Sequence, residues 1–211
     1  LSCKGEGRVH DLAVFIDYLS LPQHGECGDE ADPKFGALRT EEEVESFKRG
    51  LASVNLWYAH QGVSVWLLRS VPPRVLHKYE SRGWPCFEQA VAGMITDCTK
   101  IVDIDDGALS FSSWDDLHEA CRVGRPPPVP PEHFASLLEA KHFTNGQEDM
   151  AFVARKYKET FEEVVGQATA LWFVDLGWGD EEASALAAVL PFCSHLQQLA
   201  IGGNDFSAGD A

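Results

Sequence analysis

The stretch Tyr79–Glu88, YESRGWPCFE, decides the predicted fold of this 211-residue chain. It follows a short apolar run that is typical of a buried strand. Pro85 suits the first position of a helix, where a missing N–H group has no intrahelical partner to lose. Beyond it, apolar side chains recur on one helical face, at Phe87, Val91, Met94 and Ile95. The stretch therefore predicts a strand, a turn and then a helix that begins at Pro85.

Glu88 falls in the first turn of that predicted helix, away from its apolar face. A carboxylate there is stabilised by the positive end of the helix dipole, and this ordinary role is sufficient to explain it. The alternative is functional, because side chains at the carboxyl ends of parallel strands line ligand-binding clefts. Glu88 is therefore a candidate catalytic carboxylate, and both interpretations stay open.

Three short apolar runs predict parallel strands: Leu12–Ile16 (LAVFI), Val63–Leu68 (VSVWLL) and Ile101–Ile104 (IVDI). Helical patterns separate them. One helix begins at the capping box of Thr40 and Glu43 and continues to Trp57, and another is capped by Ser113. The alternation of strand and helix predicts an α/β domain over residues 1–123, with three layers and a mainly parallel, flavodoxin-like sheet.

Polar side chains follow the first predicted strand. The candidates for a ligand-binding cleft at this exit are Asp17, Tyr18, Ser20 and Gln23. A plain polar exit from a strand into a surface loop explains the same residues equally well.

The turn with Trp84, Cys86 and Glu88 resembles the start of the third helix in Toll/interleukin-receptor (TIR) domains. It is also similar to the RGW…E segment of fungal heterokaryon-incompatibility (HET) domains. The segment FIDYLSLPQ, residues 15–23, is similar to a HET motif with a strand ending in ID and a loop ending in NQ, except that Pro22 replaces the Asn. The resemblance covers residues 9–122, and it implies that the first strand and helix of the family precede this chain.

This resemblance implies two functions. One is a signalling module that self-associates or recruits a partner. The other is NAD cleavage, because the Glu at the place of Glu88 is catalytic in NAD-cleaving TIR domains. Glu88 would then stabilise an oxocarbenium-like transition state. Arg82 would meet a phosphate, Trp84 would buttress the turn, and Tyr18 or Trp66 would stack on a base.

The C-terminal part begins with the proline-rich residues 124–131, GRPPPVPP, which predict a stiff polyproline II linker. A ligand for an SH3- or WW-type partner is the alternative. Residues 132–167 contain two amphipathic patterns and predict a helical bridge. In residues 168–211, Leu171 and Phe173 recur 28 positions later as Leu199 and Ile201, and a pattern L-x-x-L-x-L-x-x-N ends at Asn204.

This last pattern resembles the start of a ribonuclease-inhibitor-type leucine-rich-repeat array. In such repeats the Asn satisfies main-chain groups at a turn, and the concave surface binds protein ligands. The resemblance therefore implies a protein partner. One and a half repeats do not form a stable solenoid alone, so the array is expected to continue past Ala211.

Composition excludes several classes. The net charge of −16 argues against binding nucleic acid or an anionic membrane surface. No apolar run approaches the ~20 residues of a membrane span. The six cysteines are scattered and predict reduced thiols in the cytoplasm. His24 with Cys27 and His118 with Cys121 each have an H-x-x-C spacing, so a zinc site is an alternative to the absence of a metal. Cys86 falls at a helix start, which lowers the pKa of a thiol, so a cysteine nucleophile is an alternative as well.

Overall fold

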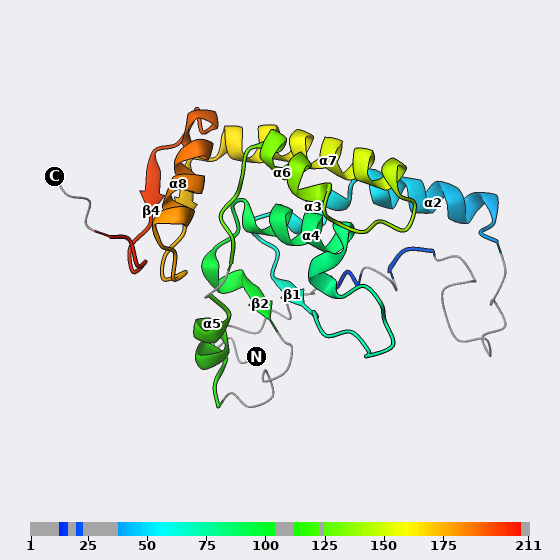
Figure 1. The fold of residues 1–211 in the computed structure, drawn as a ribbon, viewed down its shortest axis with the longest axis horizontal. Helices are drawn as coiled ribbons and strands as arrows, with labels where there is room; N and C mark the ends of the chain where they lie inside the picture. Colours follow the sequence, from blue (N-terminus) through cyan, green and yellow to red (C-terminus); the bar gives the residue numbers. More distant parts are fainter. Residues whose placement is uncertain (1–12, 17–19, 23–37, 104–111, 123–124, 208–211) are drawn as a thin grey trace, which may run out of the picture. The chain divides into compact units, whose positions relative to one another are not determined.

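The structure is a computed structural model that describes residues 13–16, 20–22, 38–103, 112–122 and 125–207 (Figure 1). The chain divides into two compact units, residues 1–54 and residues 55–211. Each unit is described by itself. Among the described residues, no helix is both long enough and apolar enough to cross a membrane.

The first unit contains helix α2 (Glu41–Ala52), which begins as predicted. Thr40 Oγ1 accepts a hydrogen bond from the N–H of Glu43 at 3.2 Å, and the Glu43 carboxylate accepts one from the N–H of Thr40 at 2.8 Å. The helix ends earlier than expected, because the Ser53 hydroxyl donates to the carbonyl of Arg49 and competes with the helical main chain. A short helix, α3 (Val54–Tyr58), follows.

The predicted strand at Leu12–Ile16 is wrong over its described part. Residues 13–16 have no regular structure, and Val14 and Ile16 are 77% and 49% exposed. Both main-chain groups of Ile16 are used locally: its N–H donates to the Ser20 hydroxyl at 2.8 Å, and its carbonyl accepts from the N–H of Ser20 at 2.7 Å. An apolar run whose main chain folds back in this way cannot extend a strand ladder.

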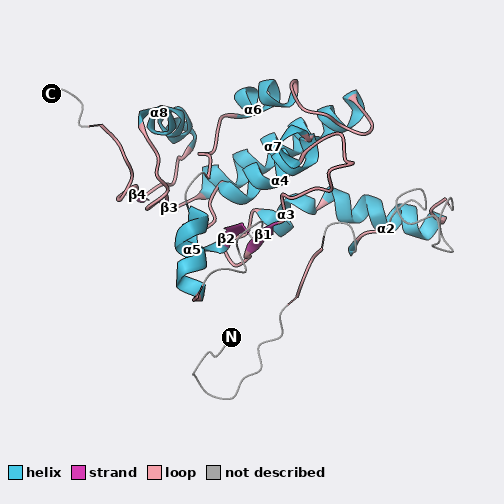
Figure 2. Ribbon diagram, turned by 60° about the horizontal axis from the view of Figure 1, so that its bottom comes forward, coloured by secondary structure: helices cyan, strands magenta, loops and turns pink. Residues whose placement is uncertain are grey.

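The second unit contains the other two predicted strands, and they are parallel. Strand β1 (Val65–Leu67) pairs with β2 (Ile101–Asp103), with Val65 opposite Ile101 (Figure 2). A buried cluster joins this sheet to the helix that connects the two strands; its members are Val65, Leu67, Ala92 and Ile101. The α/β class and the parallel pairing are thus confirmed, although both strands are shorter than their apolar runs.

Between the two strands lie the 3₁₀ helix η1 (Tyr79–Ser81) and helix α4 (Gly83–Gly93). Helix α4 begins two residues before Pro85, which is its third residue and not its first. Gly83 opens the helix because its Cα lies against Phe143, whose ring atoms would stand 1.9 Å from an added Cβ. The early start places Glu88 in the second turn, so the prediction that it lies in the first turn is wrong.

The chain continues with the 3₁₀ helix η2 (Cys98–Lys100) before β2, and then with α5 (Trp114–Arg122), α6 (Pro131–Leu138) and α7 (Gln147–Gln167). Ser113 caps α5 as predicted, accepting from the N–H of Asp116 at 3.1 Å. Helix α7 packs along both α4 and α6 (Figure 1).

The proline-rich segment packs against α7. The Tyr157 hydroxyl donates to the carbonyl of Val129 at 2.8 Å and accepts from its N–H at 3.3 Å. Arg125 is buried, and its carbonyl accepts from the indole N–H of Trp178 at 2.6 Å. These contacts tie the segment to the helices and to the C-terminal region. The division into domains at this segment stays a prediction.

The C-terminal region is a β–α–β unit. It consists of β3 (Ala170–Trp172), α8 (Asp180–Val189), the 3₁₀ helix η4 (Leu190–Phe192) and β4 (Gln198–Ala200). Strands β3 and β4 are parallel, and Leu171 lies opposite Leu199, at the 28-residue offset read from the sequence. Helix α8 is capped by Gly179, whose N–H donates to the Glu182 carboxylate.

Candidate functional site

An ion pair marks the carboxyl ends of β1 and β2. Arg69 lies two residues beyond β1, Asp103 is the last residue of β2, and their side chains form a salt bridge. Both are partly exposed, at 40% and 23%. The strands are parallel and adjacent, so the two residues that follow or end them reach the same edge of the sheet.

Tyr79 lies beside this ion pair and beside α4. Burial raises the pKa of the Tyr79 hydroxyl far above its ordinary value, and the negative charge of Glu88 raises that pKa further. Asp103 and Cys86 act in the same direction, whereas Arg69 opposes them. Tyr79 therefore keeps its proton at neutral pH. Through it, Glu88, half-buried in the second turn of α4, belongs to the same group of side chains as Arg69 and Asp103.

Cys86 shares these surroundings but is not activated. Burial raises the pKa of its thiol, and the positive charge of Lys141 only partly opposes that change. The sequence-based argument that a helix start lowers this pKa is therefore wrong, because burial outweighs the helix dipole. At neutral pH the sulfur is a protonated thiol, which is a poor nucleophile.

Trp84 faces α7 and not the edge of the sheet. Its indole N–H donates to the Asp149 carboxylate at 3.1 Å, and its ring lies edge-on to Phe87 and tilted against Phe152. This arrangement agrees with a buttressing role for Trp84, and it directs the ring away from the Arg69–Asp103 pair.

Arg82 precedes α4 and is exposed. Its main chain forms a parallel bridge with His142. Around this bridge, the N–H of Gly83 donates to the carbonyl of His142 at 2.9 Å, and the N–H of His142 donates to the carbonyl of Ser81 at 2.8 Å. The loop after α6 thereby holds the start of α4 in place.

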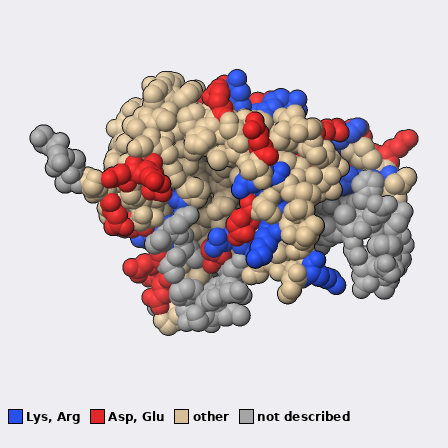
Figure 3. Space-filling view, in the orientation of Figure 1, with Lys and Arg blue, Asp and Glu red and all other residues tan. Residues whose placement is uncertain are grey.

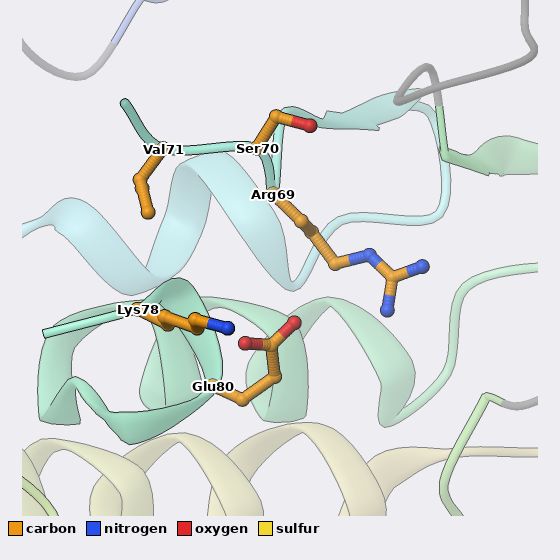
Figure 4. Close-up of a pocket in the computed structure, with 5 residues that line it drawn as sticks. All are labelled: Arg69, Ser70, Val71, Lys78 and Glu80. Atoms are coloured by element: carbon orange, nitrogen blue, oxygen red, sulfur yellow. The ribbon is translucent and has the colours of Figure 1, made fainter. Parts of the chain in front are cut away.

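A surface pocket of about 340 Å³ lies next to the ion pair. Its lining residues are Arg69, Ser70, Val71, Lys78 and Glu80 (Figure 4). The Lys141 ammonium donates to the carbonyl of Glu80 at 2.7 Å and so fixes one wall of the pocket. Of the residues proposed from sequence, none lines this pocket.

The remaining sequence candidates divide into two groups. Ser20 belongs to the first unit, where its hydroxyl is bonded to Ile16. Asp17, Tyr18 and Gln23 lie outside the described residues, as do the His24–Cys27 spacing and the side chains of His118 and Cys121. No group of three or more metal-ligating side chains occurs in the part of the chain that the structure describes.

Sequence reasoning missed Arg69, Asp103 and Lys141. For the first two a signal existed, since charged residues that end adjacent parallel strands reach one edge. Lys141 lies 61 residues after Glu80 in sequence, so no local pattern could have indicated its contact with the Glu80 carbonyl.

A second surface lies on the C-terminal β–α–β unit. Leu171 is buried on the inner side of β3, whereas its neighbour Trp172 is 46% exposed and stands opposite the small Ala200. Figure 3 shows acidic side chains gathered over the region of α8 and β4. An exposed tryptophan on a strand offers apolar area to a partner, and the acidic side chains of the same unit offer charge.

No protein-family model, no curated protein and no solved structure matches this chain.

Proposed function

We propose that this chain is a cytoplasmic signalling module that binds a protein partner through its C-terminal β–α–β unit. In this proposal, residues 168–211 begin a leucine-rich-repeat array, and residues 1–123 form a three-layer TIR/HET-like module that self-associates or recruits. The partner presents an apolar pocket for Trp172, and it presents positive charge to the acidic side chains over the region of α8 and β4.

One observation carries the proposal: β3 and β4 pair in parallel at a register offset of 28 residues, and Asn204 bonds to the turn that follows β3. Asn204 Oδ1 accepts from the N–H groups of Leu176 and Trp178, and its amide donates to the carbonyls of Phe173 and Ile201. This is the arrangement by which stacked repeats satisfy their turns and present one strand face to a ligand. On that face, Trp172 is the large exposed side chain of β3.

The test compares two exposed tryptophans. Trp172 and Trp66 each occupy a three-residue parallel strand, and they are 46% and 56% exposed. A photo-crosslinking amino acid is placed at either position in the full-length protein, cross-linked proteins are identified, and their affinities are measured with purified partner. Position 172 is expected to capture a partner that position 66 does not, and Trp172→Ala is expected to weaken that partner by about tenfold or more. Equal cross-linking at both positions, or equal affinities of Trp172→Ala and Trp66→Ala, would contradict the proposal.

The second candidate function is NAD cleavage by Glu88. The observation that favours it is the position of this carboxylate, which acts on Tyr79 beside the Arg69–Asp103 pair at the carboxyl ends of two parallel strands. A carboxylate so placed stabilises positive charge that develops on a ribose ring. A protonated Tyr79 donates a hydrogen bond in the same place.

Nicotinamide release by the full-length protein tests this candidate. Glu88→Gln removes the charge and keeps the shape of the side chain, and Glu163→Gln does the same at an exposed position of α7. Loss of about a hundredfold or more in Glu88→Gln alone is the expected result. Equal rates in both variants would remove Glu88 from the mechanism, and no release by the unaltered protein would remove the candidate function.

A further inference from the structure

The segment after β1 is positive in a strongly acidic chain. The whole sequence has 33 Asp and Glu against 17 Lys and Arg, yet no acidic residue occurs between Glu45 and Glu80. Arg69, Arg74 and Lys78 fall in the last part of this interval. Figure 3 shows Lys and Arg side chains over the segment that follows β1 and over the start of α4. Within this interval of sequence the charged side chains are all positive, so the segment supplies cations to a small anion in an otherwise acidic chain.

The pocket beside β1 brings two of these cations together. Arg69 lies just beyond the end of β1, and Lys78 is the residue before η1; both line the pocket. In Figure 4 the side chains of Lys78 and Glu80 point toward one another, and Arg69 extends toward the same space. The Glu80 carboxylate thus faces the space that an anion would enter. Ser70 lies in the wall of the pocket, but its hydroxyl points away from Lys78 and Glu80.

Arg69 is not saturated by its ion pair with Asp103. A guanidinium group has five N–H donors, and the buried Nε–H of Arg69 has no hydrogen-bond acceptor within the described part of the chain. A buried donor without an acceptor is costly, and a small rotation of the guanidinium toward an incoming oxyanion would satisfy it.

We infer that this pocket binds the phosphate group of a small molecule. Arg69 and Lys78 supply the positive charge and the hydrogen-bond donors. Glu80 acts as an internal competitor, since its carboxylate must turn away for the phosphate to enter. A volume of about 340 Å³ accommodates a phosphate or diphosphate group with part of the molecule that carries it. This inference does not depend on either proposed function.

If Glu80 competes with the phosphate, removing its charge should raise the affinity, whereas removing the charge of Lys78 should lower it. The full-length protein is titrated calorimetrically with inorganic pyrophosphate at pH 7.5 and low salt. Lys78→Gln is expected to weaken binding by about tenfold, because one charge-assisted contact is lost. Glu80→Gln is expected to tighten binding by about fivefold, because like charge is removed from the site. Raising the salt concentration to about 200 mM should weaken binding to the unaltered protein.

Helix α7 provides a matched control. Lys158 and Glu162 form an exposed ion pair there, so Lys158→Gln and Glu162→Gln make the same changes of net charge away from the pocket. Both controls are expected to leave the affinity unchanged. The inference is overturned by the absence of saturable binding, by weakening in Glu80→Gln, or by control variants that change the affinity as much as the pocket variants. Failure here leaves partner capture at Trp172 and nicotinamide release unaffected, so the three ideas are tested separately.

Discussion

Asn204 accepts, through its side-chain Oδ1, a hydrogen bond of 3.0 Å from the main-chain N–H of Leu176, which lies 28 residues earlier. The same side chain bonds to three further main-chain groups, so a single amide holds both turns of the β–α–β unit. Main-chain groups in a turn have no ladder partner, and a side chain that replaces such partners stabilises the turn.

Asn204→Ala is expected to lower the free energy of unfolding by about 2–4 kcal/mol, because partly buried main-chain donors and acceptors lose their partner. Urea unfolding followed by tryptophan fluorescence measures this change. Asn145→Ala is the control, since Asn145 is exposed and bonds to Asp149 one turn away, and it should cost less than about 1 kcal/mol. Equal losses in the two variants would show that the Asn204 bonds do not hold the unit together.

Gly83→Ala is expected to destabilise the protein by about 1–3 kcal/mol, because the added methyl group overlaps the Phe143 ring. In Gly166→Ala, a substitution within α7, the added Cβ would lie 4.0 Å from the carbonyl oxygen of Phe192. That variant should be neutral or stabilising by up to about 1 kcal/mol, since alanine favours helix. Thermal unfolding measures both. Phe143→Leu in the Gly83→Ala background should recover part of the loss, and an additive double variant would refute the steric explanation.

Stability should fall at alkaline pH because of Tyr157. Burial raises the pKa of its hydroxyl in the folded protein above the ordinary value near 10. Below about pH 10 the folded and the unfolded protein both hold the proton, so Tyr157 contributes no pH dependence to the free energy of unfolding. Above it the unfolded chain loses the proton first, so the free energy of unfolding decreases as pH rises.

Urea unfolding between pH 8 and 11.5 measures this decrease, and Tyr157→Phe should make it shallower. At pH 8 the same variant should cost about 1–2 kcal/mol, because Val129 loses two hydrogen bonds. An unchanged slope in Tyr157→Phe would assign the alkaline loss to other groups.

Cys86 should react slowly with iodoacetamide at pH 7.5, because burial holds its thiol protonated. Site-resolved mass spectrometry gives the alkylation rate, and a short unstructured peptide with one cysteine supplies the reference. Lys141→Met should slow the reaction further, because this lysine favours the thiolate. A Cys86 that reacts faster than the reference peptide would revive its interpretation as a nucleophile.

The elements that sequence reasoning predicted correctly depend on short-range signals. The capping box of α2, the Ser113 cap of α5 and the 28-residue offset of β3 and β4 all follow from residues a few positions apart or from a recurring pattern. The helix starts were less accurate. Pro85 is compatible with any of the first helical positions, so it could not show that α4 begins at Gly83, which depends on the ring of Phe143.

The candidate site was predictable in part. Sequence reasoning expected Glu88 near the carboxyl ends of parallel strands, and its catalytic role stays a prediction. Its charge acts on Tyr79 of η1, which lies beside the pair of Arg69, from the segment after β1, and Asp103 of β2; only the packing brings these residues together. Whether the proposed candidates Asp17, Tyr18 and Gln23 join this group stays a prediction.

By itself, the sequence determined the parallel strands at Val65–Leu67 and Ile101–Asp103, the amphipathic helices and the role of Asn204, because each is encoded by local periodicity or by a repeat. Tertiary structure alone decided three other features: the exposure of Val14 and Ile16, the packing of the proline-rich segment on Tyr157, and the burial that keeps Cys86 protonated. An apolar run or a thiol has the same local sequence in either environment. The exposure of the run and the protonation of the thiol depend on which distant groups pack against them, and neighbouring residues along the chain do not contain that information.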